Sequence, residues 1–120
     1  MRRLAPALAL ALALASPGGA ALAQHAGHTM PAPAGENAAS RGYREAMDRM
    51  MRDMPAPTGN ADRDFLAGMI PHHQAAVDMA RALLQHGRDP EVRRMAETII
   101  RDQEREITEM RAMLARIPAR

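Results

Sequence analysis

The sequence has no cysteine, tryptophan or lysine, and its aromatic side chains are limited to Tyr43 and Phe65. Without cysteine, the chain can form neither disulfides nor thiolate metal sites. Methionine supplies much of the apolar content instead, with 11 methionines in the 120-residue chain. Because methionine is flexible and fills a core with little definition, we expect one small and loosely packed domain.

The motifs of several metalloenzyme classes are also missing. The chain contains no His-Glu-x-x-His, which excludes a zinc-protease helix of that type. No glutamate is followed three residues later by histidine, so the di-iron bundle signature is absent. With few converging carboxylates, structural zinc and hard-ion sites have weak support. No set of residues indicates a reaction, and we predict that the protein is not an enzyme.

Residues 1–23 have the organisation of a secretory signal peptide. Arg2 and Arg3 form a short positive region, and an almost unbroken Ala/Leu run follows from residue 4 to residue 15. Residues 21–23 match a signal-peptidase site, and the apolar run is too short to anchor the chain across a bilayer. We therefore predict cleavage after Ala23, a periplasmic or secreted mature protein, and no membrane anchor after cleavage.

The charge of the mature chain is close to neutral. Loss of the signal peptide removes two arginines and leaves 14 basic residues against 14 acidic ones. Their signs alternate along the helices, as in RRMAETIIRDQEREITEMR, a pattern typical of a solvated helix face. Because there is no basic stripe, we do not expect nucleic acid as a partner.

Residues 24–39, with the sequence QHAGHTMPAPAGENAA, are rich in Gly, Pro and Ala and show no apolar period. We therefore expect a flexible leader. It contains His25, His28 and Met30, which could donate to a soft metal ion without being folded. The alternative, an incidental polar tail, stays open.

Three amphipathic segments follow the leader and predict an all-α fold, a small antiparallel helical bundle over residues 40–117. The helices are expected at about 40–54, 62–86 and 90–116. Each begins after a residue type that caps helices well, namely Ser40, Asn60 or Asp62, and Asp89. Prolines shortly after the first and third segments end those helices.

The second segment carries an adjacent histidine pair, His72 and His73, between Met69 and Met79. At about 100° per residue, all four fall within an apolar arc that covers roughly half of the helix circumference. One neighbouring helix cannot cover so wide an arc, so either the first helix or a second copy of the chain must cover the rest. Two imidazoles beside thioether sulfur on a mostly buried face indicate a candidate site.

The first segment carries a stripe of methionine at the spacing of a buried helix face. Its members are Met47, Met50, Met51 and Met54. Such a stripe is usually part of a core, but this one contains no Leu, Ile or Val, although leucine would pack with better definition. We expect these methionines to pack in the core in part and to offer soft donors to a metal ion.

Two polar residues, Gln103 and Glu106, lie in or beside the apolar stripe of the third segment. A buried polar group without a partner costs about 1–3 kcal/mol, so both side chains need partners. The natural partners are His72 and His73 on the antiparallel neighbour, which is joined by a short loop. Carboxylate or amide oxygens that orient an imidazole are a common supporting feature of metal sites.

Imidazole and thioether ligands in an exported protein favour copper, particularly copper(I), or silver because of its similar softness. The expected principal ligands are His72, His73, Met69 and Met79. Further candidate donors are Met110, Met113, the methionines of the first helix, and His86, for which an interaction with the helix dipole is the alternative. The predicted function is copper buffering, copper tolerance or delivery to another periplasmic copper protein.

Two other interpretations stay open. A non-metal interaction module or chaperone-like helical module would use a methionine-rich surface for adaptable contacts, and it would tolerate the loss of both histidines. A copper(II)-handling or oxidising enzyme would show visible copper(II) absorption and turnover.

Three stretches together resemble the domain-of-unknown-function 305 family of exported, helical, copper-associated bacterial proteins. They are DRDFLAGMIPHHQAAVDMA at 62–80, DPEVR at 89–93 and AETIIRDQEREITEMRAML at 96–114. The resemblance implies a ferritin-like helical bundle and periplasmic copper binding or tolerance. It points to a copper site formed by Met69, His72, His73, Met79 and Met110, with Gln103 and Glu106 in support. This chain has Met113 where the family often has tryptophan, which adds a sulfur donor and removes a packing anchor.

Overall fold

The computed structural model describes residues 34–118, which form three α-helices connected by short loops. They are α1 (Ala38–Asp53), α2 (Ala61–His86) and α3 (Pro90–Leu114). The expected signal peptide at 1–23 lies outside the described residues, and so do His25, His28 and Met30 of the expected leader. None of the helices between residues 34 and 118 is long and apolar enough to cross a membrane.

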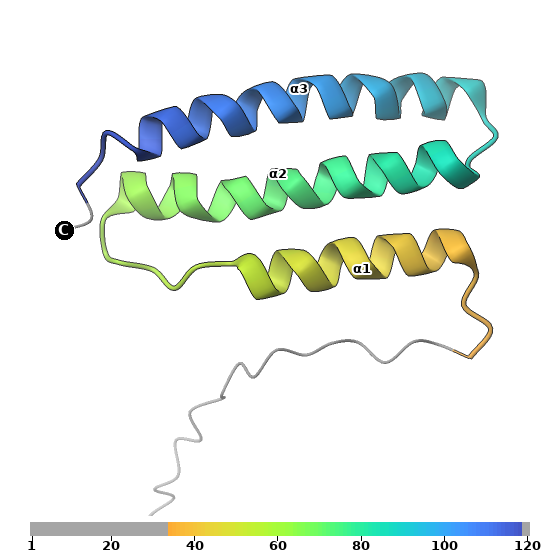
Figure 1. Cartoon of the computed structure of the whole chain (residues 1–120), viewed down its shortest axis with the longest axis horizontal. Coiled ribbons are helices and arrows are strands. Elements are labelled where there is room, and N and C mark those ends of the chain that lie inside the picture. Colours follow the sequence, from red (N-terminus) through yellow and green to blue (C-terminus); the bar gives the residue numbers. More distant parts are fainter. Residues whose placement is uncertain (1–33, 119–120) are drawn as a thin grey trace, which may run out of the picture.

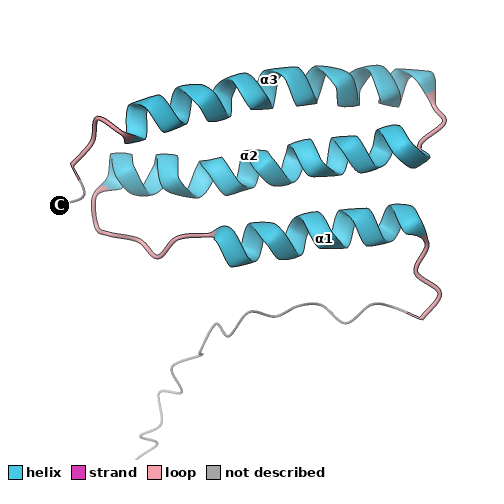
Figure 2. Cartoon of the chain, viewed as in Figure 1, coloured by secondary structure: helices cyan, strands magenta, loops and turns pink. Residues whose placement is uncertain are grey.

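The three helices lie side by side in one layer with α2 in the middle (Figure 1). α1 packs against one flank of α2 and α3 packs against the other, and each is antiparallel to α2. Within the described part of the chain, α1 and α3 are not neighbours. Figure 2 shows only helices and loops over these residues. The predicted all-α, antiparallel bundle of three helices is confirmed.

Each helix begins at a side chain that accepts hydrogen bonds from the first turn. Asn37 accepts from the backbone N–H of Ser40 at 2.9 Å, Asn60 accepts from that of Arg63 at 3.1 Å, and Asp89 accepts from two N–H groups of α3. The predicted cap Ser40 is therefore wrong. Because Asn37 caps α1, the helix starts two residues earlier than expected and includes the last two residues of the expected leader.

Small residues bring α1 close to α2. A Cβ added at Gly42 of α1 would lie 2.9 Å from the Cβ of Ala82 on α2. Ala46, Ala75 and Ala82 are all buried. Because these side chains are small, the two backbones approach each other without large residues between them. α1 therefore faces α2 with Gly42 and Ala46, not with its methionine stripe.

The main core lies between α2 and α3. It consists of Leu66, Val77, Ile107 and Met110, and partly buried apolar residues of both helices pack around it. By contrast, Met47 and Met51 of α1 and its C-cap residue Met54 are exposed, and Met50 is half-buried. The expectation that the methionine stripe packs in a core is thus largely wrong, because Gly42 and Ala46 occupy the contact with α2.

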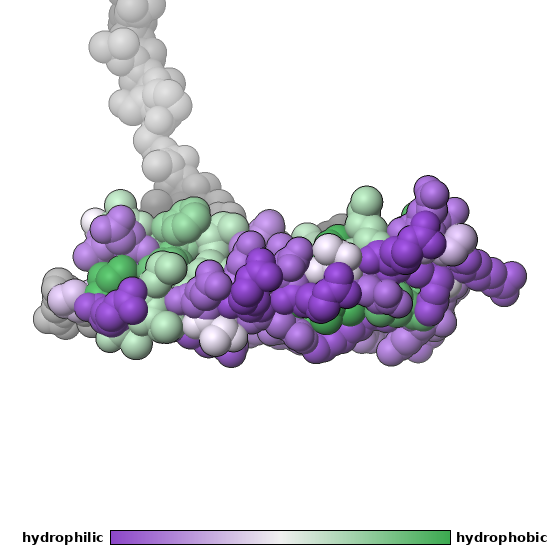
Figure 3. Space-filling model, turned by 90° about the horizontal axis from the view of Figure 1, so that it is seen from above, coloured by the Kyte–Doolittle hydropathy of each residue, from purple (hydrophilic) through white to green (hydrophobic). Residues whose placement is uncertain are grey.

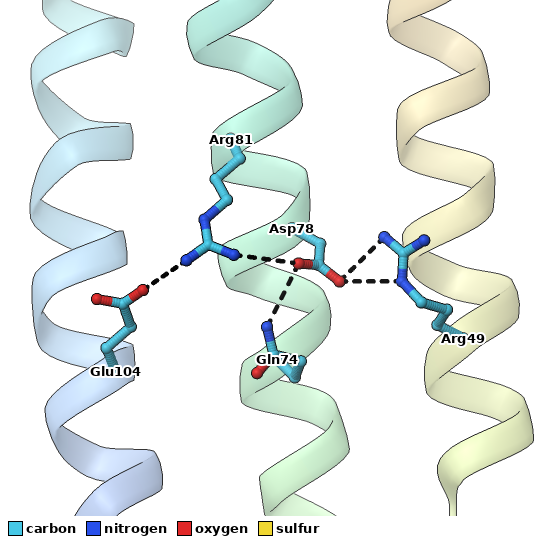
Figure 4. A network of polar contacts seen from close by, with 5 residues as sticks. All are labelled: Arg49, Gln74, Asp78, Arg81 and Glu104. Carbon is cyan, nitrogen blue, oxygen red and sulfur yellow. Dashed lines mark hydrogen bonds and ion pairs between the residues drawn. The ribbon is translucent and has the colours of Figure 1, made fainter.

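One face of the layer is polar and is connected by ion pairs across all three helices (Figure 4). Asp78 in the middle of α2 accepts from Arg49 of α1 at 3.0 Å and from Gln74 at 3.3 Å. Arg81 of α2 donates to Glu104 of α3 at 2.7 Å. Exposed pairs such as these contribute about 0–1 kcal/mol each, so they add little stability. They keep this face of the layer polar.

The opposite face of the layer, which we call the open face, carries large apolar side chains and the exposed candidate histidine His72. Helical spacing places its residues on one side of each helix, away from the ion pairs. Its members are Tyr43, Met47, Met50 and Met54 of α1, Phe65, Met69, His72, Ala76, Met79 and Leu83 of α2, and Val92, Met95, Ile99, Glu106 and Met113 of α3. Figure 3, which looks onto α3, shows hydrophobic residues gathered toward the end where α3 finishes and hydrophilic residues across its middle.

The loop between α1 and α2 is held by the carboxylate of Asp64. The backbone N–H and the hydroxyl of Thr58 donate to Asp64 Oδ1 at 2.8 and 2.7 Å, and the N–H of Gly59 donates to Oδ2 at 2.9 Å. These hydrogen bonds, the one from the Thr58 backbone first, lower the pKa of Asp64 below its ordinary value. The charged carboxylate therefore ties the loop to the first turn of α2.

We expect Asp64→Asn to destabilise the fold at neutral pH and to lose this effect in acid. The pKa of Asp64 is lower in the folded state than in the unfolded state, where it is about 3.9. Its contribution is therefore fully present above about pH 4 and is lost as the pH falls through the folded-state pKa. Urea midpoints of the wild type and the variant at several pH values between 7 and 3 measure this.

Asp62→Asn is the matched control, because Asp62 lies in the same helical turn and accepts none of these three hydrogen bonds. A difference between wild type and Asp64→Asn that is as large at pH 3 as at pH 7 would contradict this account of the loop.

Candidate metal site

The imidazole of His73 is held between two oxygen atoms at the contact between α2 and α3. Its Nδ1 lies 2.9 Å from the backbone carbonyl of Met69, and its Nε2 lies 2.8 Å from Glu106 Oε2. A carbonyl oxygen can only accept, so Nδ1 carries a proton. The carboxylate of Glu106 accepts a hydrogen bond from Nε2 when Nε2 also carries a proton. The contact between His73 and Glu106 that the sequence suggested is present.

This arrangement leaves one ring atom of His73 for a ligand. Nδ1 is committed to the carbonyl one helical turn earlier, which fixes both the tautomer and the direction of the ring. Nε2 is the atom whose proton can be exchanged for a metal ion, with Glu106 beside it. Histidine ligands of metal sites are usually oriented in this way, by a carbonyl or carboxylate on the other nitrogen.

His72 differs from its neighbour because it is exposed on the open face. Its ring meets the ring of His73 edge-on, with centroids 6.0 Å apart and an interplanar angle of 60°. No residue within 34–118 forms a hydrogen bond to the His72 ring. The predicted burial of both histidines is therefore wrong for His72, because neither α1 nor α3 covers this side of α2.

Two methionines complete a group of four residues between α2 and α3. Met69 lies one turn before His73 and packs against the core cluster that includes Met110. Met110 lies one turn after Glu106 and is buried. Met69 and His73 of α2 thus face Met110 and Glu106 of α3. We call these four residues the central group.

α1 places further methionine side chains at the same height along the helices as His72 and His73. The Sδ of Met54 lies 3.6 Å from the position that a Cβ on Gly68 would occupy, one turn before His72. Because α1 runs antiparallel to α2, Met50 lies one turn further along, at about the level of His72. Met47 lies one turn beyond Met50. Met51 points to the outer edge of α1 by helical spacing and is 59% exposed.

The remaining predicted donors lie away from this level. Met79 is two helical turns, about 10 Å, from His72, and Met113 lies near Phe65 at the other end of the layer. His86 ends α2, 14 residues after His72. The side chain of Gln103 forms no hydrogen bond with either histidine, so its predicted contact is not found. The expected ligands are therefore only partly brought together.

Met79 instead lines an apolar hollow of about 320 Å³, which we call the Met79 hollow. Its walls are Tyr43 of α1, Ala76, Met79, Ala80 and Leu83 of α2, and Val92, Met95, Ala96 and Ile99 of α3. Met95 was not among the sequence-predicted donors, although its thioether shares this hollow with that of Met79. Only the register between α2 and α3 brings the two together, and helical periodicity carries no signal for that register.

The donors at the level of the histidines are two imidazoles, thioethers from three helices and one carboxylate. Within residues 34–118, no three His, Asp or Glu side chains converge as a metal centre. Thioether and imidazole donors are the types that suit copper(I) and silver(I) rather than calcium or magnesium. The residues present therefore fit the metal that the sequence suggested.

Comparison with known proteins assigns the chain to a family. Residues 10–114 match the model of the family described as "Domain of unknown function (DUF305)". A 53-residue stretch is 40% identical to the uncharacterized protein L153 of Acanthamoeba polyphaga mimivirus, and it covers 44% of this chain and 35% of that protein. The chain therefore spans about a third of the length of this relative. The match over residues 10–114 shows that the chain belongs to the DUF305 family.

Proposed function

We propose that the protein is an exported copper(I)-binding protein that buffers copper or passes it to another periplasmic copper protein. Silver(I) would occupy the same donors because its softness is similar. The proposal includes no catalytic activity. It rests on the donor set around His72 and His73, on the expected signal peptide and on the absence of thiolate or multi-carboxylate alternatives in the sequence.

The observation that carries the proposal is the position of His72. It is an exposed imidazole without a hydrogen-bond partner in the described chain, and it lies within one helical turn of Met69. Met54 lies beside the preceding turn of α2. Because His72 faces solvent, a metal ion can bind its ring without breaking a contact within the described chain. The ring lies beside soft donors.

His73 and Glu106 would support this site and respond to its occupation. The hydrogen bond from Nδ1 to the Met69 carbonyl keeps the ring fixed while Nε2 gives up its proton. Glu106 lies close enough to take that proton or to balance the charge of the cation. Bound copper(I) would be held by neutral nitrogen and sulfur donors, which favour the reduced ion.

The test is a competition titration with copper(I) against a chromogenic chelator, in which wild type, Met69→Leu and Met95→Leu are compared. Leucine replaces methionine with little change in volume, so each variant removes mainly the sulfur. We expect the wild type to compete, Met69→Leu to bind roughly 10–100-fold more weakly, and Met95→Leu to match the wild type. Absence of competition by the wild type would overturn the proposal. Loss in Met95→Leu without loss in Met69→Leu would move the site to the Met79 hollow, which Met95 lines and Met69 does not.

The exposed methionines also favour a second candidate function, a non-metal interaction module. Met47, Met51 and Met95 are 44%, 59% and 64% exposed, and flexible thioether surfaces adapt to varied partners. Such a module would bind its partner equally well without His72 and His73. Copper(I) binding that needs the histidines separates the two functions.

A further inference from the structure

The open face is too apolar for a surface in contact with water. Five of its large side chains are more than a third exposed at positions away from α1, and Phe65 and Met95 reach 63% and 64%. The others are Met79, Val92 and Met113. Together with Met47 and Met54, they offer on the order of 600–800 Å² of apolar surface, close to the ~800 Å² that each partner contributes to a standard interface.

The apolar surface is divided into two ends by a polar middle. Phe65 and Met113 lie at the end where α2 begins, and the Met79 hollow lies at the end where α2 finishes. His72 and the His73–Glu106 pair lie between them. Phe65 is seven residues before His72 and Met79 is seven residues after it, which is about 10 Å in each direction. A projecting side chain and a hollow are therefore equidistant from His72.

We propose that a second copy of this chain packs face to face on the open face, with its α2 antiparallel to the first. The two-fold axis lies in the interface, perpendicular to α2, at the level of His72. Each Phe65 then enters the Met79 hollow of the other copy. A parallel arrangement would place Phe65 against Phe65 and leave both hollows empty, so the antiparallel register fits better. The polar face, with its ion pairs, stays in water on both sides.

The axis brings the two His72 imidazoles together. Each His72 ring is exposed and forms no hydrogen bond within residues 34–118, so the dimer would bring two solvent-facing imidazoles together. Two imidazoles facing each other form a site for one soft monovalent cation shared between the copies. This shared site rests on the proposed function, whereas the dimer itself needs no metal.

The first test is the mass of the purified protein in solution, measured by light scattering with a metal chelator present. We expect twice the chain mass for the wild type and a monomer for Phe65→Asp, because a carboxylate cannot enter the apolar hollow. Met51→Asp is the matched control, since Met51 is similarly exposed, at 59% against 63% for Phe65, but lies on the outer edge of α1, and it should stay dimeric. Weak complexes have dissociation constants in the micromolar range. A wild type that stays monomeric up to about 100 μM would therefore overturn the proposal.

The second test determines the register of the two copies by oxidative cross-linking. Because the chain has no cysteine, only the introduced thiols can form a disulfide. A residue on the two-fold axis meets its own copy, so His72→Cys should cross-link to itself. Phe65→Cys alone should not, but a mixture of Phe65→Cys and Met79→Cys should form the mixed dimer, because a disulfide needs Cα atoms about 4.4–6.8 Å apart. Efficient self-cross-linking of Phe65→Cys with none for His72→Cys would overturn the antiparallel register.

A copper(I) titration of Phe65→Asp separates this inference from the proposed function. If the dimer exists and shares copper, the wild type binds one ion per two chains through His72, and Phe65→Asp loses that stoichiometry. If the wild type is a monomer that still binds copper, the dimer is wrong and the proposed function stands. If the wild type is a dimer that binds no copper, the dimer stands and the proposed function is wrong.

Discussion

Replacing both histidines, His72→Ala with His73→Ala, is expected to weaken copper(I) binding by more than about 100-fold. That loss exceeds the 10–100-fold typical of removing a supporting contact, because both imidazole donors disappear. The fold should survive the change. His72 is exposed, and the Glu106 side chain is 43% exposed, so water can solvate its carboxylate once His73 is gone. The measurement is the chelator competition, with helicity followed by circular dichroism.

His86→Ala is the matched control for the double variant. It removes an exposed imidazole from the same helix, at its C-terminal end and away from the central group. We expect its copper affinity to equal that of the wild type. If the double variant kept its affinity, the site would have to lie at the Met47–Met54 stripe or in the expected leader with His25, His28 and Met30.

The largest effect on stability is expected at Met110. Met110→Ala should reduce the free energy of unfolding by about 2–5 kcal/mol, because the buried side chain leaves a cavity against Leu66, Val77 and Ile107. Met110→Leu should cost less than about 1.5 kcal/mol, since it conserves volume. Urea unfolding measures both. A cost below about 1 kcal/mol for the alanine variant would show that this core is not formed as described.

Met110→Leu also tests whether Met110 is a metal ligand or only a core residue. Its copper affinity should fall if the sulfur belongs to the site and should equal the wild-type affinity if Met110 only packs. Both answers are compatible with copper binding at His72 and His73, since Met69 and Met54 lie closer to the open face.

The fold could be predicted from the sequence because its signals are local. Asn60, Asp89 and the prolines after α1 and α3 mark helix ends through hydrogen bonds and ring geometry that depend on few neighbours. The start of α1 was missed because Asn37 and Ser40 are caps of similar strength, and the sequence does not distinguish them. The structure selects Asn37, whose side chain accepts from Ser40.

The arrangement of the helices could be predicted only in part. The wide apolar arc of α2 indicated that more than one neighbour is needed, but periodicity does not say which side each neighbour takes. α1 docks through Gly42 and Ala46, small residues that give little signal in a sequence. The more conspicuous methionine stripe therefore lies beside the contact and leaves His72 exposed.

The same limit applies to the site. The pairing of His73 with Glu106 followed from helical spacing and a short connection, and it is present at 2.8 Å. The contact predicted for Gln103 is absent, and the neighbourhood of Met79 and Met95 was not foreseen. Both depend on the relative sliding of α2 and α3, where a shift of one turn, about 5.4 Å, exchanges one set of neighbours for another.

The central claim is that imidazole and thioether groups hold copper(I) at the open face. X-ray absorption at the copper edge, on protein loaded with copper(I) and then desalted, tests it most directly. We expect a reduced-copper edge and a coordination shell with both nitrogen and sulfur scatterers, and loss of the nitrogen contribution in the variant without His72 and His73. A shell of oxygen or nitrogen alone, or copper that is lost on desalting, would contradict the claim.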